Sequence, residues 1–121
     1  MANEANTPRK ASAKLLANQF EGLKLICGMV TKTTRAYKSP SKAGVPTTQT
    51  AVGSAAGLSQ GYVSLFENGA VVPANDADLR TLLEESGFDL SKPGGLAFFD
   101  LIKFLRDKES DIQKLEEELP E

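Results

Sequence analysis

The residue types that usually carry enzyme chemistry are scarce in this chain. Histidine is absent and cysteine occurs once, at Cys27. Nucleophilic catalysis of the Ser-His or Cys-His kind therefore lacks its base, and a zinc site lacks its usual ligands. No convergent set of acid, base or metal ligands is visible, so we expect no enzyme, no cofactor and no metal. Cys27 lies in an apolar run and is expected to be a small buried hydrophobe rather than a reactive thiol.

The polar side chains best suited to recognition lie in residues 48–69. Val63 and Phe66 are three positions apart in this segment, so both are expected to face a core. The opposite face holds Gln60, which carries an amide, Ser64, which carries a hydroxyl, and Gly61, which has no side chain. The Gln60 amide and the Ser64 hydroxyl can form hydrogen bonds with a partner, which indicates binding.

Two short helices are predicted to position these side chains. Thr48 is suited to cap a helix that begins at Gln49, and Gly57 can take the left-handed conformation that ends it. Ser59 can cap a second helix, which ends at Asn68-Gly69. Two short helices joined by a three-residue turn that contains glycine have the geometry of a helix-turn-helix.

This segment resembles the helix-turn-helix of the phage repressor family, which includes lambda repressor and Cro and is also called the xenobiotic response element family. The residues that match the family pattern are Thr48-Gln49, Gly53, Gly57, Leu58, Ser59, Val63-Ser64, Glu67-Asn68-Gly69 and Pro73. The resemblance covers residues 48–73 and extends towards 86. Two departures stand out: the family usually has Ala at the position of Gly53, and its first helix precedes the motif without the ten-residue loop expected here.

The resemblance implies an all-α domain that inserts helix 60–68 into the major groove of double-stranded DNA. The implied base contacts are Gln60, Gly61 and Ser64, and the Gln60 amide is of the type that pairs with adenine. The implied phosphate contacts are Gln49, Ser59, Tyr62 and Asn68. Gln49 would also brace Gln60, and Tyr62 is equally compatible with partly buried packing.

The charge is distributed unevenly along the chain. Residues 1–48 hold eight Lys or Arg and two acidic residues, a net charge of +6, while residues 49–121 carry −8. Such segregation fits a basic half that meets a polyanion, and it fits a solvated tail beside an acidic helix equally well. No Lys or Arg occurs between Gln49 and Leu79, so the cations that neutralise phosphates must come from elsewhere. The candidates in the preceding segment are Lys32, Arg35, Lys38 and Lys42, with Arg9, Lys10 and Lys14 as an arm.

The remaining sequence divides into four parts. Residues 1–10 have no apolar period and are expected to form a disordered basic arm. A helix from about Ser12 follows, with Leu16, Phe20, Leu23, Cys27 and Val30 on one face, and it opens the DNA-binding domain of residues 11–90. Residues 91–95 are expected to be a linker, and residues 96–121 a C-terminal helix.

The C-terminal helix carries a short heptad seam, Phe98, Leu101, Leu105, Lys108, Ile112, Leu115 and Leu119. Packing within the chain explains its first half, but few apolar surfaces remain to cover the second half. We therefore expect dimerisation through Leu105, Ile112, Leu115 and Leu119. A separate protein partner and simple solvated fraying are the alternatives.

Together these features predict a compact all-α bundle with a lambda-repressor-like helix-turn-helix, followed by the C-terminal helix. The predicted function is a sequence-specific, homodimeric transcriptional regulator that acts as a repressor. An antitoxin or a phage or plasmid copy-control protein of the same fold is an alternative, and so is a protein-interaction adaptor that keeps the helix-turn-helix as a scaffold. The polar start and the lack of a long apolar run lead us to expect a cytoplasmic, nucleoid-associated protein with no membrane partner.

Overall fold

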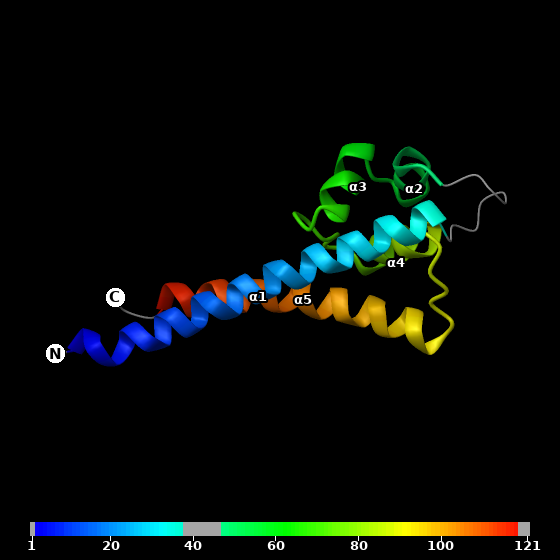
Figure 1. The fold of residues 1–121 in the computed structure, drawn as a ribbon. Helices are drawn as coiled ribbons and strands as arrows, with labels where there is room; N and C mark the ends of the chain where they lie inside the picture. Colours follow the sequence, from blue (N-terminus) through cyan, green and yellow to red (C-terminus); the bar gives the residue numbers. More distant parts are fainter. Residues whose placement is uncertain (1, 38–46, 119–121) are drawn as a thin grey trace.

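The computed structural model describes residues 2–37 and 47–118, and every regular element in these ranges is an α-helix. The helices are α1 (Ala2–Tyr37), α2 (Gln49–Ala56), α3 (Gln60–Glu67), α4 (Asp76–Glu85) and α5 (Pro93–Glu118). Figure 1 shows α1 and α5 lying side by side in opposite directions, with α2 and α3 on one side of the C-terminal half of α1. Helix α4 contacts both α2 and α5. The expected compact, all-helical architecture is confirmed for these residues.

The core lies where α2, α3 and α4 meet the α1–α5 pair. Its most deeply buried members are Val52, Val63, Leu79, Leu82, Leu83, Ile102 and Leu105. Val63 and Phe66 of α3 are both buried as their spacing predicts, and Cys27 of α1 is a buried part of the same cluster. Burial of this apolar surface is the main force that holds the short helices together, because helices of eight residues are too short to be stable alone.

Helix α1 is longer than the sequence predicted. Residues 2–10 were expected to be disordered, but they are helical and continue directly into the rest of α1. Ala2, Glu4, Ala5, Arg9 and Lys10 favour a helix here, whereas Pro8 is unfavourable inside one. The absence of an apolar period was therefore a poor guide, because helix propensity does not depend on an apolar period. The expected loop from Lys38 to Thr47 lies almost wholly outside the described residues.

Helix α1 covers the C-terminal helix, contrary to expectation. The Lys24 ammonium lies 2.8 Å from the Glu109 carboxylate, and the Lys24 side chain is buried in this contact. The rings of Phe20 and Phe104 lie 6.0 Å apart between centroids. Leu105 and Ile112, expected to pair with a second copy, are instead buried within the chain. The sequence did not reveal that these two residues are covered within the chain, because the antiparallel pairing of α1 and α5 could not be predicted from either helix alone.

Helix α5 begins at Pro93, three residues before the expected start and inside the expected linker. Proline is well suited to the first position of a helix, where its missing N–H would have no partner. Farther along α5, Arg106 lies 2.7 Å from the Asp76 carboxylate at the start of α4 and donates a hydrogen bond to the Pro73 carbonyl. Lys103 lies 3.0 Å from the same carboxylate. These contacts fix α5 against the beginning of α4.

None of the helices in the described part of the chain combines the length and the apolar character needed to cross a membrane.

Candidate nucleic-acid interface

The turn between α2 and α3 has the local geometry that its residues predicted. The Thr48 hydroxyl accepts a hydrogen bond from the Ala51 N–H and caps α2. Gly57 ends that helix with φ of 71°, in the left-handed region. The Ser59 hydroxyl then accepts a hydrogen bond from the Tyr62 N–H and caps α3. These local bonds fix where each helix starts, and therefore which residues begin α3.

Gly53 explains how tightly the turn folds back on α2. A Cβ atom at this position would lie 2.5 Å from the Leu58 carbonyl oxygen, closer than side chains are found. The Leu58 N–H also donates a hydrogen bond to the Gly53 carbonyl, with an N–O distance of 2.8 Å. Glycine at this position is thus matched to the close approach of the turn to α2.

Helix α1 approaches the end of α3 equally closely. A Cβ atom on Gly28 would lie 2.5 Å from the carbonyl oxygens of Phe66 and Glu67. On the other side of the crossing, a Cβ on Gly69 would lie 2.6 Å from the Leu25 Cα, and Gly69 has φ of 78°. Two glycines therefore allow α1 to cross α3 backbone to backbone, which brings the Arg35 side chain within reach of Glu67.

A chain of hydrogen bonds runs from α1 through the end of α3 to the start of α3. The Arg35 guanidinium donates two hydrogen bonds to the Glu67 carboxylate, at 2.7 and 3.0 Å, and a third to the Thr47 carbonyl at 2.9 Å. The Gln49 amide donates to Glu67 Oε1 at 2.7 Å, and the Gln60 amide donates to Gln49 Oε1 at 2.6 Å. Bidentate, charge-assisted bonds of this kind have a fixed geometry. The outermost side chain, Gln60, is thus held by a buried ion pair through one intermediate amide.

Burial differs sharply along this chain. The Glu67 side chain is 1% exposed and that of Arg35 is 12% exposed, whereas Gln60 is exposed. A buried carboxylate needs a charged partner and further hydrogen bonds to offset its lost hydration, and both are present at Glu67. The protein uses one N–H of the Gln60 amide, and within the described residues no hydrogen bond involves its carbonyl oxygen. A carbonyl and an N–H are the pair of groups that reads adenine in the major groove.

Most of the expected DNA-contacting residues of α3 and its caps are exposed. Gln60, Gly61, Ser59 and Asn68 are exposed, and Ser64 and Tyr62 are half-buried on the same helix. The nearest atom to a Cβ at Gly61 is the Ser59 Oγ at 3.9 Å, so a ligand backbone can approach here closely. Burial and the negative charge of Asp78 raise the pKa of the Tyr62 phenol, which keeps it protonated and able to donate. The expected bracing of Gln60 by Gln49 is confirmed.

The expected supply of phosphate-binding cations needs a correction. Arg35 was expected to contact phosphate, but its guanidinium is turned inward to Glu67 and Thr47. Lys32 is exposed on α1 and Lys14 is exposed nearer its start. Lys38 and Lys42 lie outside the described residues, as do the side chains of Arg9 and Lys10 and the expected dimerisation residue Leu119. Of the expected pairing residues, Leu115 remains exposed.

Sequence reasoning missed Glu67 as the centre of the network. It was noted only as part of the Glu-Asn-Gly match, although it lies one position after buried Phe66 and four after buried Val63. That spacing predicts an inward-facing side chain, and a buried acid needs a cation. Because residues 49–79 offer no Lys or Arg, the partner had to come from outside this segment. The spacing therefore indicated a distant cation without identifying Arg35.

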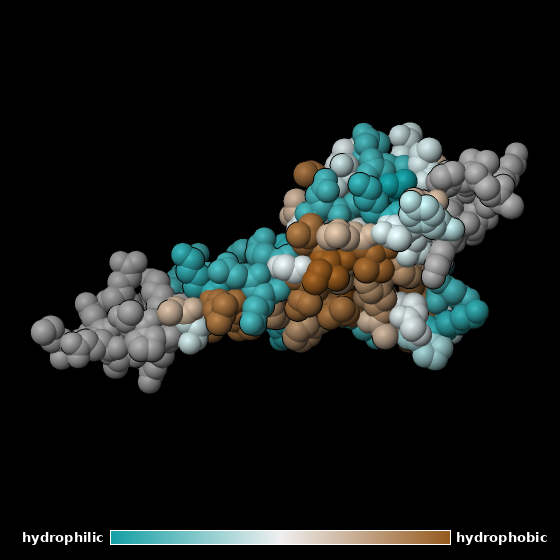
Figure 2. All heavy atoms as spheres, viewed as in Figure 1, coloured by the Kyte–Doolittle hydropathy of each residue, from teal (hydrophilic) through white to brown (hydrophobic). Residues whose placement is uncertain are grey.

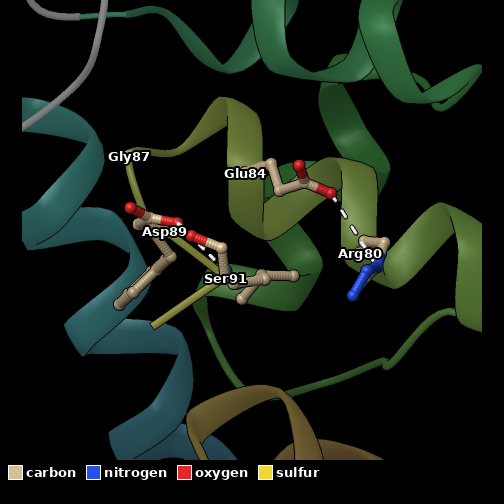
Figure 3. A pocket seen from close by; sticks show the side chains of 7 residues that line it. Arg80, Glu84, Gly87, Asp89 and Ser91 are labelled. Atoms are coloured by element: carbon tan, nitrogen blue, oxygen red, sulfur yellow. Dashed lines mark hydrogen bonds and ion pairs between the residues drawn. The ribbon is translucent and has the colours of Figure 1, made fainter. Parts of the chain in front are cut away.

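A hollow of about 460 Å³ at the end of α4 is another feature that could hold a ligand. It is lined by Arg80, Glu84, Gly87, Phe88, Asp89, Leu90 and Ser91 (Figure 3). Its charged groups contact near neighbours in the chain: Arg80 lies 3.9 Å from Glu84, and Ser91 donates two hydrogen bonds to Asp89. These Ser91 bonds lower the pKa of Asp89. Because its charged groups already contact near neighbours in the chain, the α2–α3 surface is the stronger candidate.

Comparison of the chain with protein-family models, with curated proteins and with solved structures finds no match in any of the three.

Proposed function

We propose that this chain is a sequence-specific regulator that binds double-stranded DNA with α3 in the major groove, in the manner of the phage repressor family that its sequence resembles. The observation that carries the proposal is the hydrogen-bond chain that ends at Gln60. An exposed glutamine fixed at the first position of a helix has its rotamer chosen before binding, and such preorganisation favours specific recognition. Occupation of a promoter by the bound protein is the simplest mode of action, which is repression.

The shape of the surface supports the same proposal. Gly61 leaves open space beside Gln60, and Ser64 lies one helical turn beyond it. These three positions form one face of α3, which is eight residues long. A helix of this size enters the major groove, where its first residues contact base edges.

Arg35 no longer counts among the residues that the sequence suggested for phosphate binding. Since Arg35 is held by Glu67, the exposed cation of α1 nearest to this region in sequence is Lys32. Binding is therefore expected to depend on salt without a contribution from Arg35, because the slope follows the number of phosphates neutralised. Lys32→Ala should weaken binding to specific and random DNA alike.

A direct test compares a duplex selected from a random pool with an unselected duplex, by fluorescence anisotropy. Gln60→Ala should weaken binding to the selected site by about 1–3 kcal/mol and leave the unselected duplex nearly unchanged. Gln113→Ala, at an exposed glutamine of α5, is the matched control and should change neither. Equal losses of affinity on both duplexes would show that Gln60 contacts the DNA backbone and does not read a base.

A protein-interaction adaptor is the second candidate, and one observation favours it. The α2–α3 surface carries no cation of its own, and Arg35 is not free to supply one. An adaptor would not bind unselected duplex even at low salt, whereas a DNA-binding regulator must do so. The same anisotropy series therefore separates the two.

A further inference from the structure

One side of α1 is apolar, uncharged and uncovered. From residue 11 to residue 37 the charged side chains are Lys14, Glu21, Lys24, Lys32 and Arg35. Their spacings of seven, three, eight and three place all five on one half of the helix. The opposite half carries a stripe of large apolar side chains that are 37–84% exposed: Leu15, Leu16, Leu23, Ile26, Met29, Val30 and Tyr37. A helix that faced only water on this side would carry charges there.

The stripe continues onto α5. Phe20 of α1 contacts Phe104, which is 51% exposed, and Leu101 nearby in α5 is 41% exposed. Figure 2 shows hydrophobic residues gathered over the middle of α1 and the adjoining part of α5, while the region of α2 and α3 above them is largely hydrophilic. A hollow of about 440 Å³ lies along the stripe, lined by residues that include Ile26, Val30 and Tyr37. The apolar surface is therefore continuous and shaped to receive side chains.

We propose that this surface joins two copies of the chain into a homodimer. Its size fits that role, because seven large side chains that are 37–84% exposed form a patch that continues onto α5, and a standard interface takes roughly 800 Å² from each partner. Monomeric proteins rarely leave a continuous apolar patch this large uncovered. The interface differs from the heptad seam expected on α5, of which Leu105 and Ile112 are buried within the chain.

Because the stripe carries no charge, a second copy of this chain is the partner that suits it best. In a twofold dimer each surface meets itself, so any charged residue near the axis would face its own copy. A stripe without charges avoids that repulsion, and it also offers no charge pattern that would specify a different partner. Pairing through this stripe leaves the hydrophilic surface of α2 and α3 uncovered in both copies (Figure 2). The inference does not depend on what α3 binds.

Sedimentation velocity on the full chain across the micromolar range tests the proposal. Wild type should sediment as a dimer, and Ile26→Glu should raise the dissociation constant roughly tenfold or more. Because Ile26 is 57% exposed, helicity by circular dichroism should not change. Thr33→Arg, at an exposed polar position of the stripe, removes no apolar contact and should have the same effect. Leu96→Glu, at a residue of α5 that is 42% exposed and precedes the patch, should leave the dimer intact.

Two results would overturn the proposal. A wild-type chain that stays monomeric across this range would show that the stripe does not pair, and binding of that monomer to neutral lipid vesicles would assign the stripe to a membrane surface. A dimer that persists in both Ile26→Glu and Thr33→Arg would place the interface elsewhere.

Discussion

The guanidinium of Arg35 and the carboxylate of Glu67 form a bidentate ion pair, although the two residues are 32 positions apart in the sequence. Neither residue faces the proposed ligand, yet the pair fixes the amide of Gln49, which in turn fixes Gln60. The stability of the fold and the proposed recognition thus depend on one network. The buried residues Arg35 and Glu67 can be tested by measuring stability, and the exposed Gln60 by measuring binding.

Glu67→Gln should destabilise the protein strongly. The substitution keeps the shape of the side chain but leaves the Arg35 guanidinium, 12% exposed, without its counter-charge. Breaking a buried pair from one side costs about 3–5 kcal/mol, which urea unfolding at neutral pH would measure. Glu84→Gln removes an exposed pair with Arg80 at 3.9 Å and should cost about 0.5 kcal/mol or less. Similar effects of the two substitutions would contradict the role assigned to Glu67.

Gln49→Glu should place a second carboxylate beside Glu67. The Gln49 amide now donates to Glu67 at 2.7 Å, and a carboxylate there would repel it instead. We expect a loss of about 1–3 kcal/mol near neutral pH, with partial recovery in acid, because the introduced carboxyl can donate again once protonated. Urea midpoints at several pH values would show this trend, and Gln113→Glu on α5 is the control. A pH-independent change would exclude the repulsion.

Gly28→Ala should separate α1 from α3. The added Cβ would lie 2.5 Å from two backbone oxygens that cannot rotate away, so the helices must move apart and strain the Arg35–Glu67 pair. The expected loss is about 1–3 kcal/mol by thermal or urea unfolding. Gly94→Ala in α5 has no atom within 4 Å of its Cβ position and should leave stability unchanged or raise it by up to about 1 kcal/mol. Equal effects would mean that the close crossing is not needed.

Asp76 should make the stability of the protein sensitive to acid. Hydrogen bonds from Arg106 and then Lys103 lower the pKa of Asp76 below its ordinary value of 3.8. A lowered pKa in the folded state contributes stability that is present above the unfolded value and is lost as the pH falls through the folded pKa. Asp76→Asn should therefore lower the urea midpoint at neutral pH, and its difference from wild type should shrink below about pH 4. Asp100→Asn, at an exposed carboxylate of α5, should show no such convergence.

The sequence predicted the parts of this fold that local rules control. Thr48, Gly57 and Ser59 set the bounds of α2 and α3 through bonds to residues at most a few positions away, and Asn75 caps α4 in the same way. Such interactions depend on residue type and spacing, which a sequence displays directly.

Those local rules could not predict contacts between residues that are far apart in the sequence. The burial of Ile112 depends on α1, and the inward turn of Arg35 depends on a crossing made possible by Gly28 and Gly69. A cation near a binding motif looks free until its partner is known, so Arg35 was assigned to phosphate. The hydrogen bond from Gln60 to Gln49 was the one site contact between the helices that the family resemblance predicted.

The pairing of α1 with α5 also sets an order of events while the chain is being made. Lys24 is synthesised 85 residues before Glu109, its partner, and translation at about 5–20 residues per second puts roughly 4–17 s between them. During that interval the side of α1 that α5 will cover is exposed together with the uncovered stripe, so the nascent helix is apolar on both flanks. A ribosome-bound chain that ends before α5 should therefore bind chaperones, and release of α5 should end that binding.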